Sequence, residues 1–140
     1  PLARHLRYAD RTARKMARTL AWLMTRHGPG LEKRQMLLFR LVDVGAELCA
    51  IAMACVRARE MAGQPGADHK PYILADTFCR GARRRIARHF NAIHRNDDTA
   101  NYRVARQILA GEHRWLETGY LPEPAATAAK RTEREKSVLA

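Results

Sequence analysis

The sequence has few aromatic residues, little lysine and no long apolar runs. Only 6% of the 140 residues are Phe, Trp or Tyr. No apolar run approaches the ~20 residues that a membrane-spanning helix needs. Patterns for phosphate-binding loops, serine nucleophiles, metal-binding helices and calcium loops are missing, and no signal peptide is visible at Pro1. No segment shows a strand signal of any length, which leaves an all-α chain without recognisable catalytic chemistry.

Cysteine and histidine are present, but their spacing does not favour a site. Cys49, Cys55 and Cys79 form no CxxC pair. An odd number of cysteines on apolar helix faces indicates reduced, buried thiols in a cytosolic setting rather than reactive or metal-binding ones. His89 and His94 are five residues apart and therefore lie on different helix faces. We expect no metal, no cofactor and no catalytic residue in this segment.

The sequence is rich in apolar residues and in positive charge. Hydrophobic residues make up 46% of the chain, which is enough for one domain with a real core. The formal net charge is +12, with 21 Arg against 5 Lys, and this arginine and alanine usage suggests a bacterial gene of high GC content. The excess charge comes from residues 1–27 and 70–95, at +6 each. Two cationic helices are therefore predicted.

The apolar spacing predicts three long helices and a short one. The spans are 2–26, 31–62, 71–94 and about 97–110, with an acidic cap at Asp97 or Asp98 and turns at HGPG and GQPGADHKP. We predict an all-α fold, an antiparallel helical bundle of three long helices plus a short fourth helix and a C-terminal tail. The bundle domain would span residues 1–118, and residues 119–140 would form an extended or frayed tail.

The same spacing predicts which residues point inward. The first helix would use Leu2, Leu6, Ala9, Ala13, Met16, Leu20 and Leu23. The third helix would use Leu74, Phe78, Ala82, Ile86, His89 and Ile93, with Cys79 also turned inward. The second helix has a face wider than one seam and rich in small residues, which places it centrally: Leu38, Leu41, Val42, Gly45, Leu48, Cys49, Ala52, Cys55 and Val56. Gly81, in a helix interior, indicates a close helix crossing.

Two acidic residues lie one turn apart within the second helix. Asp43 and Glu47 could act as a pair of carboxylates in acid–base chemistry. Alternatively, each could pair with an arginine of a neighbouring helix. The flanking helices are cationic and no third polar group converges in the sequence, so the ion-pair interpretation is favoured.

The stretch CRGARRRIARHF contains the candidate site, a basic docking surface. Arg80, Arg84 and Arg88 form an outward row at helical spacing, and Arg83 lies beside it. Like charges at this spacing repel one another, so we expect an acidic partner near them. Nucleic acid is disfavoured, because the row has no interleaved Tyr or Phe and the preceding loop is too long for a helix-turn-helix unit. An anionic membrane surface stays open as a partner.

Two longer motifs, in this order and spacing, resemble a known family. RHGPGLEKRQMLLFRLVDVGAELCAIAMACVRA is followed by ILADTFCRGARRRI. Together they resemble the C-terminal extension of very-long-chain-type acyl-CoA dehydrogenases over about residues 10 to 115. The family's turn falls on Gly28 to Gly30, and its two helix patterns fall on Leu37, Leu38, Arg40, Leu41 and Asp43 and on Ala75, Asp76, Thr77, Phe78 and Cys79. The tail after Pro124 has no counterpart in it.

The resemblance implies a function for the parent chain rather than for this segment. Such enzymes use FAD to oxidise long acyl-CoA thioesters, with a glutamate taking the alpha proton and the flavin taking the beta hydride. No position here matches that glutamate or the flavin contacts. The extension is expected to be a non-catalytic helical bundle that packs on the catalytic core of a homodimer. These 140 residues would then be a fragment of a longer, cytoplasmic enzyme, which could be peripheral to the inner membrane. The alternative is a free-standing basic helical module that binds nucleic acid or an anionic membrane.

Overall fold

The computed structural model describes residues 2–65 and 68–116, and over these residues the chain is helical without a strand. The long helices are α1 (Ala3–His27), α2 (Gln35–Ala62) and α3 (Lys70–His94), and the short helix is α4 (Asp98–Leu109). Two 3₁₀ helices cover Gly28–Lys33 and Arg114–Leu116. The predicted all-α class and the order of three long helices and one short helix are confirmed. The second helix starts at Gln35 rather than residue 31, because the preceding residues form a 3₁₀ helix.

The chain divides into two compact units, Pro1–Asn96 and Asp97–Ala140. The first contains the three long helices and the second contains α4. The predicted domain boundary at 118/119 and the predicted tail of residues 119–140 lie outside the described residues. They stay predictions.

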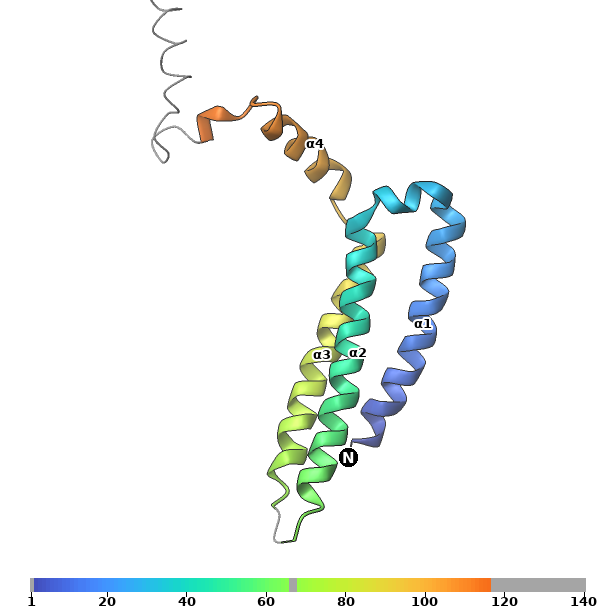
Figure 1. Cartoon of the computed structure of the whole chain (residues 1–140), viewed down its shortest axis with the longest axis vertical. Helices are drawn as coiled ribbons and strands as arrows, with labels where there is room; N and C mark the ends of the chain where they lie inside the picture. Colours follow the sequence, from blue (N-terminus) through green and yellow to red (C-terminus); the bar gives the residue numbers. More distant parts are fainter. Residues whose placement is uncertain (1, 66–67, 117–140) are drawn as a thin grey trace, which may run out of the picture. The chain divides into compact units, whose positions relative to one another are not determined.

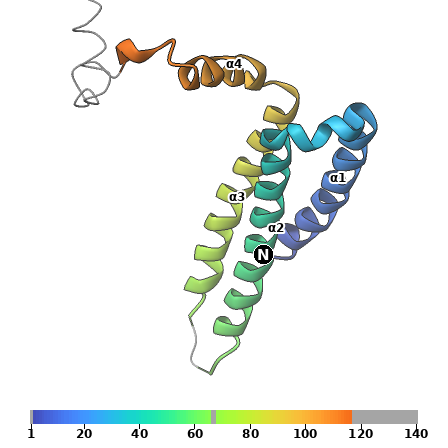
Figure 2. The ribbon, with the colours of Figure 1, turned by 45° about the horizontal axis from the view of Figure 1, so that its top comes forward.

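In the first unit, α2 packs against both α1 and α3 (Figures 1 and 2). The chain reverses direction at each connection, so both neighbours run antiparallel to α2. The first reversal begins at Gly28, whose φ of 52° is a conformation that glycine adopts without a steric penalty. The central position predicted for the second helix is confirmed.

Side-chain contacts show that α1 and α3 run parallel to each other. His5 contacts Asp76, Arg83 stacks over the Tyr8 ring at 4.4 Å, and the Lys15 ammonium lies 4.1 Å from the centre of the Phe90 ring. Trp22 and His94 complete the series, with ring centres 5.3 Å apart. The residue numbers rise together along both helices. All four contacts therefore fit a single parallel alignment of α1 against α3.

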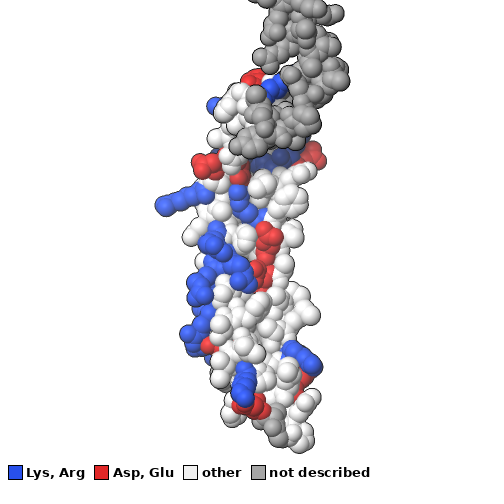
Figure 3. All heavy atoms as spheres, turned by 90° about the vertical axis from the view of Figure 1, so that its left-hand side faces the viewer, with Lys and Arg blue, Asp and Glu red and all other residues white. Residues whose placement is uncertain are grey.

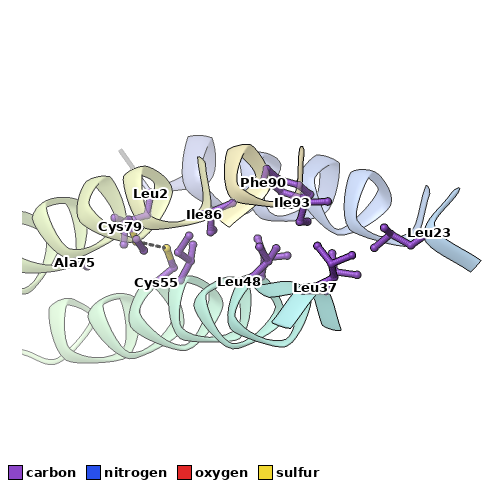
Figure 4. Packing of buried hydrophobic residues seen from close by; sticks show 14 of the residues in the cluster. Leu2, Leu23, Leu37, Leu48, Cys55, Ala75, Cys79, Ile86, Phe90 and Ile93 are labelled. Carbon is purple, nitrogen blue, oxygen red and sulfur yellow. Dashed lines mark hydrogen bonds between the residues drawn. The ribbon is translucent and has the colours of Figure 1, made fainter. Parts of the chain in front are cut away.

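The core lies along the line where the three helices meet (Figure 4). Cys55, Leu48 and Leu37 of α2 point toward α3, and Cys79 Sγ lies 3.8 Å from Cys55 Sγ. The buried apolar residues are Leu2, Leu23, Leu31, Leu37, Leu41, Val44, Leu48, Ile51, Cys55, Ala58, Ala75, Cys79, Ala82, Ile86, Phe90 and Ile93. Cys49, in contrast, is exposed, so the prediction that all three thiols are buried is wrong for this one.

The predicted inward face of α1 is half right. Leu2 and Leu23 are buried and Met16 packs against the core, as expected. Leu6 and Leu20, however, are 43% and 39% exposed. His5, which precedes Leu6, and Thr12, which precedes the exposed Ala13, are buried instead, while Thr19, which precedes Leu20, is half-buried. The polar residues are selected because His5 finds a hydrogen-bond partner on α3 and Thr12 is small enough for close packing.

At three positions of α3, the residue predicted to point inward is not the one that is buried; the next residue along the chain is buried instead. Leu74 is 72% exposed, Phe78 is 40% exposed and His89 is half-buried. The residues that follow them, Ala75, Cys79 and Phe90, are in the core with Ala82, Ile86 and Ile93, so the inward positions predicted for Cys79, Ala82, Ile86 and Ile93 are confirmed. Small residues in the first half of α3 allow its backbone to approach α2, and the larger side chains then lie outside the contact.

Gly81 does not mark a helix crossing, contrary to the sequence prediction. A Cβ atom there would meet only the Arg85 guanidinium of the same helix, at 3.3 Å. At Gly45, a Cβ would lie 3.8 Å from Met16 Sδ of α1, which is ordinary van der Waals contact. The close approach in this bundle therefore comes from alanine and cysteine rather than from glycine.

In the second unit, α4 begins after Asp97, at one of the two predicted positions, but Asp97 makes no side-chain capping hydrogen bond. Leu109 ends it, and Gly111 follows with φ of 79°. No residue of α4 is buried.

The two phenylalanines of α3 test this packing directly. Phe90→Ala should lower the free energy of unfolding by about 3–5 kcal/mol, because it leaves a cavity in the core. Phe78→Ala, the matched control on the same helix, should cost about 1 kcal/mol because the side chain is largely at the surface. Urea unfolding of the 140-residue chain, followed by circular dichroism, measures both. A larger loss of unfolding free energy for Phe78→Ala than for Phe90→Ala would instead support the packing predicted from the sequence, in which Phe78 points inward.

Candidate docking surface

One carboxylate holds the start of α1 against α3. Asp76 accepts a hydrogen bond from His5 Nε2 at 2.8 Å, and its Oδ1 also pairs with the Arg4 guanidinium. Its other oxygen lies 2.8 Å from Nε of Arg80, one turn further along α3. His5 is fully buried, and its Nδ1 has no hydrogen-bond partner among the described atoms. Three donors therefore converge on Asp76 from two helices.

These contacts stabilise the charged form of Asp76. The hydrogen bonds from His5 and Arg4 hold the pKa of its carboxyl well below the ordinary value of 3.8, and the Arg80 charge acts in the same direction. A lowered carboxyl pKa means that the folded state binds the proton more weakly than the unfolded state does. This cluster therefore contributes to stability above about pH 4 and loses that contribution on acidification.

The two acidic residues of α2 have different partners. Glu47 accepts two hydrogen bonds from Arg85 of α3, one of them 2.9 Å from Nη2 to Oε2. The hydrogen bonding lowers the pKa of Glu47. The predicted ion pair with a neighbouring arginine is thus confirmed for Glu47. Asp43 instead lies 3.7 Å from Nδ1 of His89, so its predicted arginine partner is wrong. A carboxylate neutralised by a bidentate arginine is poorly suited to take a proton from a substrate.

The four arginines of the predicted docking surface do not act alike. Arg80 pairs with Asp76, and Arg83 turns toward α1, where it covers Tyr8. Arg84 and Arg88 are exposed, and neither forms an ion pair with another of the described residues. The repulsion expected between the arginines of the row is therefore relieved by an acidic partner only at Arg80. Arg84 and Arg88 are the part of the row left for an external acidic group.

Figure 3 shows one face of the molecule, to which α3 contributes. Lys and Arg side chains gather along one edge of this face, and wide areas beside them carry no charge. An open cleft of about 490 Å³ lies there, lined by Arg4, Tyr72, Ile73, Asp76, Thr77, Arg80 and Arg84. A second open cleft, of about 500 Å³, lies between α2 and α3 and includes Phe78 and the Glu47–Arg85 pair. Both are surface openings rather than enclosed apolar slots of the kind that would bury a flavin ring.

The described residues bring together no group of three potential metal ligands. Over the same part of the chain, none of the helices combines the length and the apolar character that a membrane span requires. Burial raises the pKa of the Cys79 thiol, which disfavours the reactive thiolate.

Two features of the surface escaped the sequence analysis. The Asp76 cluster joins residues more than 70 positions apart, and no local pattern marks such a pair. The second is an exposed apolar row on α2, formed by Phe39, Val42, Ala46, Cys49, Met53 and Val56. The inward position predicted for Val42, Cys49 and Val56 is therefore wrong. The signal for this row was present, because these positions repeat every three or four residues.

The fold and surface thus define a helical bundle domain, in which polar groups pair with each other and a basic and an apolar face point outward. The family model for the ACAD9/ACADV C-terminal domain matches residues 1–112. The chain belongs to this family, which confirms the resemblance found in the sequence.

Curated relatives agree. The chain is 42% identical over 127 residues to the probable acyl-CoA dehydrogenase FadE10 of Mycobacterium bovis and of Mycobacterium tuberculosis. The matched region is 90% of this chain but 20% of each relative. The chain therefore spans about a fifth of the length of these relatives. No solved structure matches it.

The Asp76 cluster gives a pH-dependent prediction. Asp76→Asn should destabilise the chain near pH 7, because the amide keeps the shape and loses the charge that Arg4 and Arg80 attract. The difference from the unaltered chain should shrink as the pH falls below about 4, where the carboxylate begins to be protonated in the unfolded state. Urea midpoints across this range measure the change.

The matched control is Asp10→Asn, because Asp10 forms an exposed pair with Arg14 within α1. Its effect should be small at every pH. An equal loss for both variants, or a gap for Asp76→Asn that stays constant with pH, would show that the cluster does not anchor α1 electrostatically.

Proposed function

We propose that this chain is the non-catalytic C-terminal domain of an FAD-dependent acyl-CoA dehydrogenase that acts on long or very long acyl chains. The observation that carries the proposal is the family match over residues 1–112, together with relatives that are named as probable acyl-CoA dehydrogenases and are about five times as long as the matched region. In this arrangement the flavin and the catalytic base belong to the rest of the parent chain. The bundle supplies a packing surface.

The chemistry of the described residues supports this division. Glu47 is neutralised by Arg85 and Asp76 is surrounded by three donors, so neither is available as a general base. When bound, FAD would accept the hydride in the parent enzyme, and no residue described here offers a built site for it. We therefore assign to these residues the role of docking on the catalytic core. A cytoplasmic homodimer is the assembly that we expect.

The test compares two polypeptides. The parent chain that ends in these residues should be yellow, and long acyl-CoA should bleach its flavin absorbance. The 140-residue chain alone should be colourless, helical and inactive. Flavin bound to the 140-residue chain would overturn the division of roles. A coding sequence that lacks an acyl-CoA dehydrogenase core upstream of Pro1 would overturn the proposal itself.

The basic row enters the proposal as an electrostatic contact. Arg84 and Arg88 would face acidic groups of the parent enzyme or of its partner subunit, while Arg80 stays paired with Asp76. Arg84→Glu combined with Arg88→Glu should lower the melting temperature of the flavin-loaded parent enzyme by about 2–4 °C at low salt. The loss should shrink as salt screens the contact.

Arg7→Glu combined with Arg11→Glu is the matched control, because it makes the same charge change at the same spacing on the exposed face of α1. It should leave the melting temperature almost unchanged. Tight binding of duplex DNA that falls steeply with salt and is lost in the Arg84/Arg88 variant would favour the nucleic-acid alternative instead. Selective flotation with anionic liposomes would favour the membrane alternative.

A further inference from the structure

The exposed apolar row of α2 is the least expected feature of the bundle. We call it the outer seam, and it consists of Phe39, Val42, Ala46, Cys49, Met53 and Val56. All six side chains are exposed, and those of Val42 and Met53 are 64% and 66% exposed. The buried seam of the same helix, from Leu37 to Ala58, points to the opposite side, toward α1 and α3. Helix α2 is therefore apolar on two opposite faces.

Such a helix is characteristic of a protein interior. A helix that is apolar all round is normally buried, and a helix at a protein surface normally keeps a polar outer face. Scattered apolar residues at a surface need no explanation, but a continuous row that spans five turns is typical of a contact site. Between Leu41 and Val56, the only charged residues of α2 are Asp43 and Glu47, which interact with α3. The outer seam itself carries no charge.

We propose that the outer seam is the surface on which the upstream catalytic part of the parent chain packs. This inference rests on the proposed function and names the surface that performs it. The family is defined as a C-terminal domain and the relatives extend far beyond the matched region, so most of such a chain lies upstream. That partner is covalently attached, and its effective concentration therefore exceeds that of any separate molecule.

The shape and charge of the outer seam favour this occupant over lipid. Ala46 and Cys49 are small and lie between the bulkier Phe39 and Met53, so the surface is narrow in its middle and suits an interdigitating helix. A helix that lies on a membrane carries Lys and Arg beside its apolar face. Here the charged residues in the middle of α2 are the acidic Asp43 and Glu47, of which Glu47 is already paired with Arg85, so this stretch offers no Lys or Arg to anionic lipid.

Cys49 provides a natural probe at the centre of the outer seam, since it is exposed in the bundle while Cys55 and Cys79 are buried. The experiment uses the flavin-loaded parent enzyme and N-ethylmaleimide, with peptide mass spectrometry to follow each thiol. The control variant is Thr25→Cys, which places a thiol of similar size on the exposed face of α1. If the catalytic part covers the outer seam, Cys49 should react at least about tenfold more slowly than the introduced thiol. Reaction at equal rates would overturn the inference.

A photo-cross-linking amino acid in place of Met53 then identifies the occupant. A cross-link within one chain, to a peptide upstream of Pro1, supports the inference. A cross-linked dimer, a cross-linked phospholipid or a cross-link to another part of this domain overturns it. The flavin spectrum of the same preparation tests the proposed function separately. A yellow, active enzyme with a freely reactive Cys49 would contradict only the outer seam, whereas an enzyme without flavin would contradict the proposed function.

Discussion

The arrangement of the bundle depends on how closely α2 and α3 approach each other. The contact is lined by small or slender side chains, among them Ala75, Cys79 and Ala82 of α3 and Cys55 of α2. Close approach of two helices buries a narrow seam and leaves the bulkier neighbours outside it. The exposure of Phe78 and the direction in which Arg85 reaches Glu47 both follow from this close approach of α2 and α3. The surface of the domain is thus a consequence of the packing in its core.

The sequence was sufficient for the class, the order of the helices and the identity of the family. It was not sufficient for the rotation of each helix about its axis. In α1, the positions of Leu2, Met16 and Leu23 belong to both of the possible seams, and only the residues between them differ. Apolar character favoured Leu6 over His5, whereas the folded chain buries His5 because Asp76 of α3 is there to accept its hydrogen bond. That partner is 71 residues away, and spacing within one helix contains no information about it.

For the candidate surface too, the sequence predicted the local pattern but not the tertiary contacts. The periodicity of the arginines correctly indicated an outward row on α3, since it is a local property of one helix. It could not show that Arg80 is occupied by Asp76 or that Arg83 turns toward Tyr8, because both contacts depend on the tertiary arrangement. The apolar width of α2 was visible in the sequence as well. Only the structure separates that width into a buried seam and an exposed one.

The Asp76 cluster also bears on which of two arrangements α1 adopts. A rotation of α1 about its axis by less than the 100° step of one residue would bring the more apolar set of Leu6, Ala13 and Leu20 inward and keep Leu2, Met16 and Leu23 in the seam. Hydrophobic burial alone would favour that rotation. The rotation would, however, withdraw His5 and Arg4 from Asp76, and the carboxylate would lose two of its three donors. A buried polar contact of this kind contributes less to total stability than to uniqueness, because it makes one of two nearly equivalent packings much worse than the other.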